Sequence, residues 1–189
     1  MQNKDDLRKL FLGERLQLTP SEIEKKSRQI AENFFLVDKI RNKKNFSVYL
    51  PINNEVEMRF IIKNLLKKHK NLYCPYFSKV DNTYYFTKFL GWQKLEKGPH
   101  QILQPSKSEK VNPAIIEVAI IPGIAFDPQG LRLGYGKGVF DKLLSKSKAL
   151  RIGLAYDFQI VDKIPKEKHD LVMNVVITES GVIGAKDFG

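Results

Sequence analysis

The chain has 189 residues, of which 42% are hydrophobic and 28% are charged, a composition typical of one globular domain over residues 1–189. Its single cysteine, Cys74, excludes an internal disulfide and a zinc site built from cysteine pairs. No apolar run is long enough to span a bilayer, and no signal peptide precedes the charged segment that starts at Lys4, so we expect a cytoplasmic protein with no membrane contact. The formal net charge of +11 fits either nucleic acid or a small polyanionic substrate, and it does not decide between them.

Apolar periodicity predicts alternating helices and strands along most of the chain. The sequence predicts helices over residues 4–17, 20–36, 55–69 and 139–147, and strands over residues 46–52, 71–77, 83–89, 114–122, 149–156 and 171–178. A capping box begins the second helix, with Thr19 as the N-cap, Pro20 at the first helical position and Glu22 reaching back to the cap. Residues 91–111 are polar and are expected to form a long loop.

This alternation predicts an α/β fold with a largely parallel sheet. Residues 114–122 are almost continuously apolar, as expected of a strand that is buried on both faces. Ligands of such sheets bind beyond the carboxyl ends of the strands, which is where residues 122–141 would lie.

The most informative segment is the glycine-rich stretch over residues 120–141, with the sequence IIPGIAFDPQGLRLGYGKGVFD. Every second position over residues 134–138 is a glycine, so the backbone can turn its N–H groups inward around an anion. Arg132 and Lys137 add two positive charges, and Asp141 adds a carboxylate suited to Mg²⁺. Together these parts describe a site for a nucleoside triphosphate. The alternative is a flexible glycine-rich turn with incidental basic residues.

The segment is neither of the two common phosphate-binding motifs. A Walker A motif would need a glycine and a Ser or Thr where this chain has Leu131 and Gly138. A dinucleotide fingerprint that starts at Gly134 would need its third glycine at the position of Val139.

Other polar residues are candidates for ligand contacts. Lys4 and Arg8 are four residues apart and share a helix face, where they could grip one anion or simply face solvent. Glu55 follows the strand that contains Leu50, so it could anchor a heterocycle at the ligand edge of the sheet or cap the next helix. His169 has no second His or Cys at metal-ligand spacing, which argues against zinc.

With these residues assembled, the chain resembles the 5-formyltetrahydrofolate cyclo-ligases, also called methenyltetrahydrofolate synthetases. The segment PGIAFDPQGLRLGYGKGVFD matches that family's pattern of P-G-x-x-F-D, a G-x-R-L-G turn, G-x-G-K-G and a closing Asp. The resemblance extends over nearly the whole chain and includes the Lys4/Arg8 pair, LPINNEVE, Pro75, the region of Gln104-Pro105 and the HD…TE ending. It implies a three-layer α/β/α sandwich with a mostly parallel central sheet, and ATP-driven closure of 5-formyltetrahydrofolate to 5,10-methenyltetrahydrofolate with release of ADP and phosphate.

The resemblance also implies roles for individual residues. ATP would contact Lys4, Arg8, Arg132, Leu133, Gly134, Tyr135, Gly136, Lys137, Gly138, Val139 and Phe140. The folate would contact Leu50, Glu55, Tyr135, Gly136, Lys137, Gly138 and Val139. Mg²⁺ would be held by Asp141 and Asn174. We expect Lys137 and Arg132 to be the catalytic residues, because phosphoryl transfer depends on positioning and on charge stabilisation.

The chain departs from the family pattern at two places. The family commonly has two tyrosines where this chain has Val139-Phe140, and relatives have an Asp where this chain has Asn174. These departures leave another ATP-dependent phosphotransferase on the same scaffold as an alternative, and the net charge leaves a basic nucleic-acid-binding protein as a second one. For the cyclo-ligase we expect a monomer that binds ATP and 5-formyltetrahydrofolate, with or without an extended glutamate tail, and no nucleic acid.

Overall fold

The fold is built around one seven-stranded sheet, seen in a computed structural model that describes residues 3–106, 109–167 and 170–184. The helices are α1 (Lys4–Leu16), α2 (Pro20–Leu36), α3 (Arg59–Lys67) and α4 (Val139–Leu144). The strands of the large sheet are β1 (Asn45–Ser47), β2 (Asn71–Ser78), β3 (Thr83–Lys88), β6 (Val118–Pro122), β9 (Leu150–Leu154), β10 (Val175–Thr178) and β11 (Gly181–Gly184). Two small hairpins pair β4 (Leu95–Lys97) with β5 (Leu103–Pro105) and β7 (Ala125–Phe126) with β8 (Arg132–Leu133).

The predicted α/β fold with a mostly parallel sheet is confirmed. The strand order is β11-β10-β9-β6-β1-β2-β3, and every neighbouring pair from β10 to β2 is parallel. Only the two edge strands, β11 and β3, run antiparallel to their neighbours. The central strand β6 pairs Ile120 with Ile152 of β9 and Val118 with Phe46 of β1, and these side chains are fully buried. A strand that is apolar at consecutive positions can be covered by side chains on both faces, as the sequence predicts.

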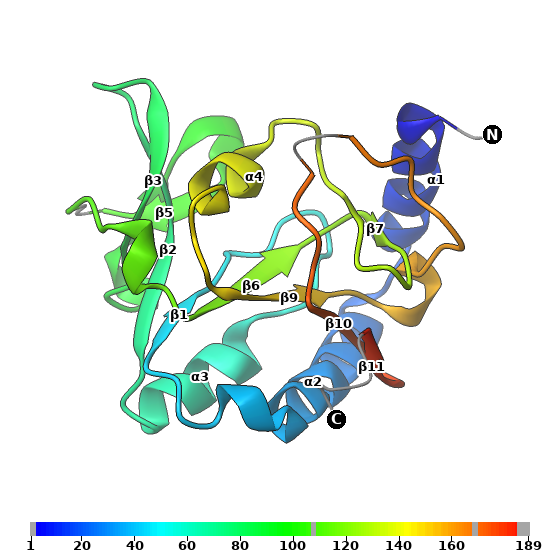
Figure 1. Cartoon of the computed structure of the whole chain (residues 1–189), viewed down its shortest axis with the longest axis horizontal. Coiled ribbons are helices and arrows are strands. Elements are labelled where there is room, and N and C mark those ends of the chain that lie inside the picture. The colour runs from blue at the N-terminus through cyan, green and yellow to red at the C-terminus, as the bar shows by residue number, and fades with distance from the viewer. Residues whose placement is uncertain (1–2, 107–108, 168–169, 185–189) are drawn as a thin grey trace.

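Helices cover both faces of the sheet, which makes the fold a three-layer α/β sandwich. Figure 1 shows α2 and α3 together on one face and α4 on the other, with α1 at the end of the molecule beside β7. The Thr19 capping box of α2 is confirmed: Glu22 N donates to Thr19 Oγ1 at 3.3 Å and Thr19 N donates to Glu22 Oε2 at 2.8 Å. Within the described part of the chain, no helix has both the length and the apolar character needed to cross a bilayer.

Several predicted boundaries are wrong, and the errors cluster near the carboxyl edge of the sheet. β1 ends at Ser47 rather than at residue 52, and α3 begins at Arg59 rather than at residue 55. The segment between them is used for other contacts, because Glu55 turns inward and the N–H of Glu57 bonds the Ser27 hydroxyl at 2.8 Å. Asn53 and its neighbour form the predicted turn, with φ angles of 48° and 57°.

Other differences concern strands that lack a strong apolar signal. Residues 91–111 contain the β4–β5 hairpin rather than one long loop, and β11 was not predicted. Both features consist of strands of three or four residues, and alternation over so short a stretch cannot be distinguished from a loop. The strands predicted over 114–122 and 171–178 form ladder pairs only over Val118–Pro122 and Val175–Thr178. The helix predicted over 139–147 ends at Leu144.

A second, smaller apolar cluster fixes α1 beside the β7–β8 hairpin. It consists of Leu7 from α1 together with Ile124, Ala125, Leu131, Leu133 and Ile164. Burying Leu7 against this hairpin places the adjacent cationic positions of α1, Lys4 and Arg8, next to the glycine-rich segment that follows β8. The packing of α1 therefore builds one wall of the cavity described next.

Candidate active site

A cavity of about 840 Å³ opens at the carboxyl ends of β1 and β6. All ten residues from Arg132 to Asp141 line it, as do Lys4, Arg8, Leu50 and Glu55. The structure thus brings every sequence-predicted site residue except Asn174 to one cavity. Part of the expected long loop also contributes to the lining, through residues 99 and 101–104 around β5.

The glycine-rich segment is held in place from both of its ends. It leaves the β7–β8 hairpin at Leu133 and enters α4 at Val139. Gly136 and Gly138 have φ angles of 84° and 61°, in the left-handed region that side chains with a Cβ rarely adopt. The backbone conformation therefore favours glycine at these two positions.

Cations gather at one end of the cavity. Arg8 of α1 donates from Nε to the carbonyl of Gly134 at 2.9 Å, so the helix is tied directly to the glycine segment. Lys4 Nζ lies 2.8 Å from Glu167 and 3.0 Å from Asp170, two carboxylates that also line the cavity. The two basic residues that share a helix face are thus both placed where an anion could bind.

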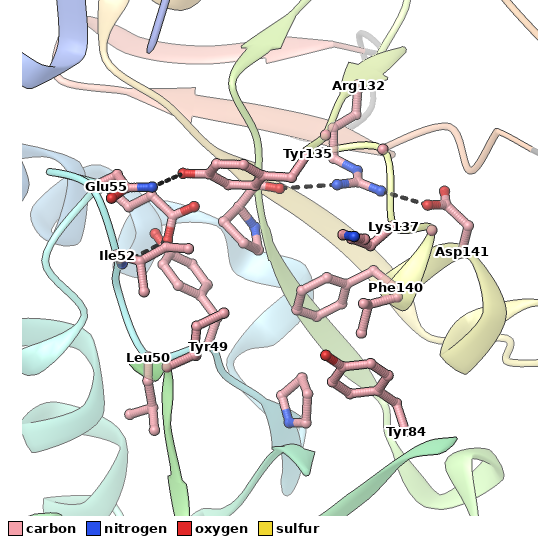
Figure 2. Close-up of a pocket in the computed structure, with 18 of the residues that line it drawn as sticks. Tyr49, Leu50, Ile52, Glu55, Tyr84, Arg132, Tyr135, Lys137, Phe140 and Asp141 are labelled. Atoms are coloured by element: carbon pink, nitrogen blue, oxygen red, sulfur yellow. Dashed lines mark hydrogen bonds and ion pairs between the residues drawn. The ribbon is translucent and has the colours of Figure 1, made fainter. Parts of the chain in front are cut away.

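Arg132 and Asp141 form the central ion pair of this cationic end. Arg132 Nη2 donates to Asp141 Oδ2 at 2.8 Å and its Nη1 donates to the carbonyl of Pro122 at 3.3 Å, as Figure 2 shows. The Arg132 side chain is only 9% exposed, and its Nε is buried without a hydrogen-bond partner among the described residues.

The donor set at Asp141 fits Mg²⁺ when part of the coordination comes from a bound phosphate. Mg²⁺ in such sites uses one or two carboxylates together with phosphate oxygens and water. Asp141 Oδ1 accepts the N–H of Leu171 at 3.2 Å, which brings the adjacent Asp170 to the same wall of the cavity. In the described residues no group of three or more His, Cys, Asp or Glu side chains is arranged to hold a metal ion. Protein ligands alone would therefore give an incomplete site.

Asn174 does not reach Asp141. Its Oδ1 accepts the N–H of Arg151 at 2.8 Å and its own N–H bonds the Arg151 carbonyl at 2.8 Å, near the amino end of β9. It lines a separate small cavity, away from the carboxyl ends of the strands. The expected metal pair of Asp141 and Asn174 is not formed in this structure, and the nearest described acidic residue along the chain is Asp170, whose carboxylate accepts from Lys4 Nζ and from the N–H of Glu167. His169, which precedes it, is outside the described residues.

The other end of the cavity is largely apolar and ends at a buried carboxylate. Leu50, Tyr84 and Phe140 line the cavity, and Figure 2 shows Glu55 on the side of it opposite Lys137 and Asp141. Glu55 is 5% exposed, and its Oε2 accepts the N–H of Ile52 at 3.1 Å. Burial raises the pKa of Glu55 to about 7, an effect that nearby positive charges partly oppose. The carboxylate is therefore an inward-facing acceptor rather than a helix cap.

Two functional features were missed in the sequence. Arg15 contacts the floor of the cavity, although its only sequence signal is its position seven residues after Arg8, on the same face of α1. Tyr49, two residues after the end of β1, also lines the cavity, and nothing in its local pattern distinguishes it from a core residue. Cys74 is fully buried, and burial raises its pKa to about 12, so it is an inert thiol as expected.

These features define an α/β protein with one large cavity that is lined by cations at one end and is largely apolar at the other. The model of the 5-formyltetrahydrofolate cyclo-ligase family matches residues 1–179, and the chain belongs to this family of ligases of folate metabolism. The predicted membership is confirmed.

Relatives and solved structures agree with this assignment. A 5-formyltetrahydrofolate cyclo-ligase from Mycoplasma genitalium is 32% identical over 86% of this chain and 90% of its own length. The enzyme of the same name from Mus musculus is 28% identical over 93% of this chain and 89% of its length. Among solved structures, 5,10-methenyltetrahydrofolate synthetase from Aquifex aeolicus matches with a TM-score of 0.85 and 32% identity, covering 97% of this chain and 93% of that one.

Proposed function

We propose that this chain catalyses the ATP-dependent cyclisation of 5-formyltetrahydrofolate to 5,10-methenyltetrahydrofolate, with release of ADP and phosphate. The observation that carries the proposal is one cavity in which a cation-rich glycine segment faces an apolar end closed by Glu55. A nucleoside triphosphate requires the first feature and a pterin ring requires the second. The names of the relatives support the folate substrate independently of this geometry.

The reaction needs ATP because the oxygen of a formamide is a poor leaving group. In the first step the γ-phosphoryl group passes from ATP to the formyl oxygen on N5, and ADP is released. In the second step the lone pair of N10 attacks the activated formyl carbon, N10 loses its proton, and inorganic phosphate leaves. Neither step requires a covalent bond to the protein, so catalysis rests on positioning and on stabilising the charge of the transferring group.

Lys137 and Arg132 are the proposed catalytic residues. Lys137 lies in the glycine segment and is exposed to the cavity, so it is free to follow the phosphoryl group as it moves. Arg132 is held by Pro122 and Asp141, and it presents a rigid guanidinium to the phosphates. Lys4 and Arg8 contribute further positive charge from α1 at the same end.

Asp141 and Asp170 are the residues that would hold Mg²⁺. The bound ion would neutralise charge on the β- and γ-phosphates. The guanidinium of Arg132, which is paired with Asp141, would bind phosphate oxygens at the same end of the cavity.

The folate would enter with its pterin ring toward Glu55. A carboxylate with one open oxygen can accept hydrogen bonds from the ring N–H and amino groups of a pterin. Leu50 and residues 135–139 would contact the ring and the formyl group from two sides. This orientation would place N5 and N10 toward the glycine segment, where the phosphoryl group is transferred.

The test is a spectrophotometric assay of purified protein with 5-formyltetrahydrofolate, ATP and Mg²⁺, in which the near-ultraviolet band of the methenyl product is followed. Product formation that requires both ATP and Mg²⁺ is the expected result. Folded protein that binds ATP but forms no product would refute the proposal and favour another phosphotransferase on this scaffold, for which hydrolysis or transfer without folate would be the signature.

A further inference from the structure

Arg15 of α1 is a fully buried cation that the mechanism above does not use. Its side chain is 1% exposed, and its guanidinium joins three segments that are distant in sequence. Nε donates to the carbonyl of Asn53 at 2.8 Å, Nη1 donates to the carbonyl of Gly123 at 2.9 Å, and Nη2 donates to the Tyr135 hydroxyl. Removing a cation from water is costly, so a buried arginine requires compensating contacts and invites a functional explanation.

The hydrogen bond from Arg15 determines the direction in which the Tyr135 hydroxyl can donate its own proton. The Tyr135 hydroxyl accepts hydrogen bonds from Arg15 and also from Asn53 Nδ2, which lies 3.2 Å away. A phenol oxygen has two acceptor positions and one proton. With both acceptor positions filled, the proton is left to donate to a ligand in the cavity, which Tyr135 lines from the glycine segment. In the view of Figure 2, Tyr135 lies between Glu55 and Arg132.

Arg15 also offsets the negative charge of Glu55 without forming a hydrogen bond to its carboxylate. Arg15 Nη2 is 4.0 Å from Glu55 Oε1, which is an ion-pair distance but too long for a hydrogen bond. Because the Ile52 N–H bonds the other oxygen, Oε1 stays open to accept from a ligand. The remaining charged or titratable groups that face this carboxyl are Arg132, Tyr49 and Tyr135.

We propose that Arg15 is a positioning residue for the folate, which orients the Tyr135 hydroxyl and keeps Glu55 ionised so that both can bind the pterin end of the substrate. Because Tyr135 belongs to the segment that would bind ATP, the same guanidinium links the two halves of the cavity. This role rests on the proposed function, since it assumes that the flat ligand is the folate.

The support from electrostatics agrees with this geometry. After burial, which raises the pKa of Glu55, the largest influence on that pKa is the charge of Arg15, which lowers it. Glu55 is half ionised at a pH of about 7. Loss of the Arg15 charge should therefore raise this pKa further, by about 1 to 3 pH units for a neighbouring opposite charge.

The first test is the titration of the Glu55 carboxyl, followed by carbon NMR of protein labelled with [¹³C]glutamate and assigned with Glu55→Gln. Arg15→Met should raise the titration midpoint by at least about one pH unit, whereas Arg41→Met should leave it unchanged. Arg41 is a matched control because its side chain is 76% exposed and forms a surface ion pair with Asp38, away from the cavity lining. A folded Arg15→Met variant with an unaltered midpoint would overturn the proposal.

The second test is the binding of 5-formyltetrahydrofolate by calorimetry between about pH 5.5 and 9. The wild-type protein should lose affinity as the pH falls below the pKa of Glu55, and Arg15→Met should begin to lose it at higher pH. At pH 8 the variant should bind roughly 10- to 100-fold more weakly, the range expected for loss of charge-assisted contacts. An arginine that is merely structural would change the folding stability and leave the pH dependence of binding unmoved.

If Arg15→Met does not fold, Tyr135→Phe and Arg15→Lys keep the proposal testable. Tyr135→Phe retains the buried cation and removes only the oriented hydroxyl, so folate binding should weaken by about tenfold with no change in the titration of Glu55. Unchanged binding in Tyr135→Phe would refute the role of the hydroxyl. A wild-type protein that binds the folate but forms no methenyl product refutes the proposed function alone, because neither the titration nor the binding requires turnover.

Discussion

Asp127, the last residue of the PGIAFD motif, is predicted to be essential for stability although it lies outside the cavity lining. Its side chain is fully buried and accepts three backbone hydrogen bonds. Oδ1 accepts the N–H groups of Leu131 at 2.9 Å and Gln129 at 3.1 Å, and Oδ2 accepts the N–H of Ile164 at 3.0 Å. The carboxylate thus closes the turn between β7 and β8. It also links this turn to Ile164, which precedes Glu167 and Asp170, the two ion-pair partners of Lys4.

Asp127→Asn tests this reasoning with almost no change of shape. The Asn side chain has one oxygen, which accepts hydrogen bonds, and one NH₂ group, which can only donate them. In either orientation the NH₂ group therefore faces at least one backbone N–H. The favoured orientation keeps the two bonds to the turn and leaves the N–H of Ile164 without an acceptor. An unsatisfied buried donor costs about 1–3 kcal/mol, and the two retained bonds lose about 1 kcal/mol each when the acceptor is no longer charged. After allowance for the smaller cost of burying a neutral group, the expected loss is about 2–4 kcal/mol.

The measurement is urea unfolding at pH 7, with a thermal scan beside it. A loss of this size should lower the midpoint temperature by roughly 5–15 °C for a chain of this length, with no change in the urea m value. Asp38→Asn is the control, because Asp38 is 70% exposed in a surface pair with Arg41 and should change stability by less than about 1 kcal/mol. An Asp127→Asn protein whose free energy of unfolding lies within about 0.5 kcal/mol of the wild type would show that the three hydrogen bonds contribute less to stability than expected.

Three further predictions concern the glycine segment and its surroundings. Lys137→Ala should lower kcat by roughly 10²–10³-fold with normal unfolding, because Lys137 is exposed and contributes charge stabilisation rather than packing; near-normal turnover would remove it from the catalytic set. Gly130→Ala should destabilise the protein by more than about 2 kcal/mol in urea, since φ is 82° and the added Cβ would lie 2.4 Å from the carbonyl oxygen of Met173. Gly13→Ala, where a Cβ meets nothing within 4 Å in the middle of α1, should instead stabilise by about 0.5–1 kcal/mol, and equal effects of the two changes would contradict the reasoning. The thiol of Cys74, whose pKa burial raises to about 12, should not react with an aromatic disulfide at pH 7.5 in the folded protein and should react once per chain in urea; rapid labelling of the native state would show that the buried strand is accessible.

Local sequence signals predicted the elements whose formation depends on near neighbours. The capping box at Thr19 sets the start of α2, and the apolar run before Pro122 forms a strand buried on both faces. Both depend on hydrogen bonds and side-chain types within a few residues, which the sequence displays directly. The end of β1 and the start of α3, on either side of Glu55, were predicted wrongly. The segment between them is shaped by distant contacts, because Glu55 is buried and the N–H of Glu57 bonds Ser27 of α2.

In the candidate site, too, the features that the sequence predicted depend on local signals. The spacing of glycines over residues 134–138, the two cations beside them and Asp141 predict an anion site, because backbone freedom and charge are properties of residue type and order. Lys4 and Arg8 were recognised as a pair because helical periodicity places residues four apart on one face. None of these signals required knowledge of what lies across the cavity.

The sequence by itself determined the fold class, the glycine segment and the chemical character of the site, since periodicity, residue type and spacing are enough for these. Only the tertiary structure decided which distant groups meet. It turned Asn174 toward the backbone of Arg151, placed the backbone of Leu171 against Asp141, and brought Arg15 to Tyr135 and Glu55. Such contacts depend on strand order and on the docking of α1 by Leu7, which are set by the burial of many apolar side chains at once and leave no mark on any single stretch of sequence.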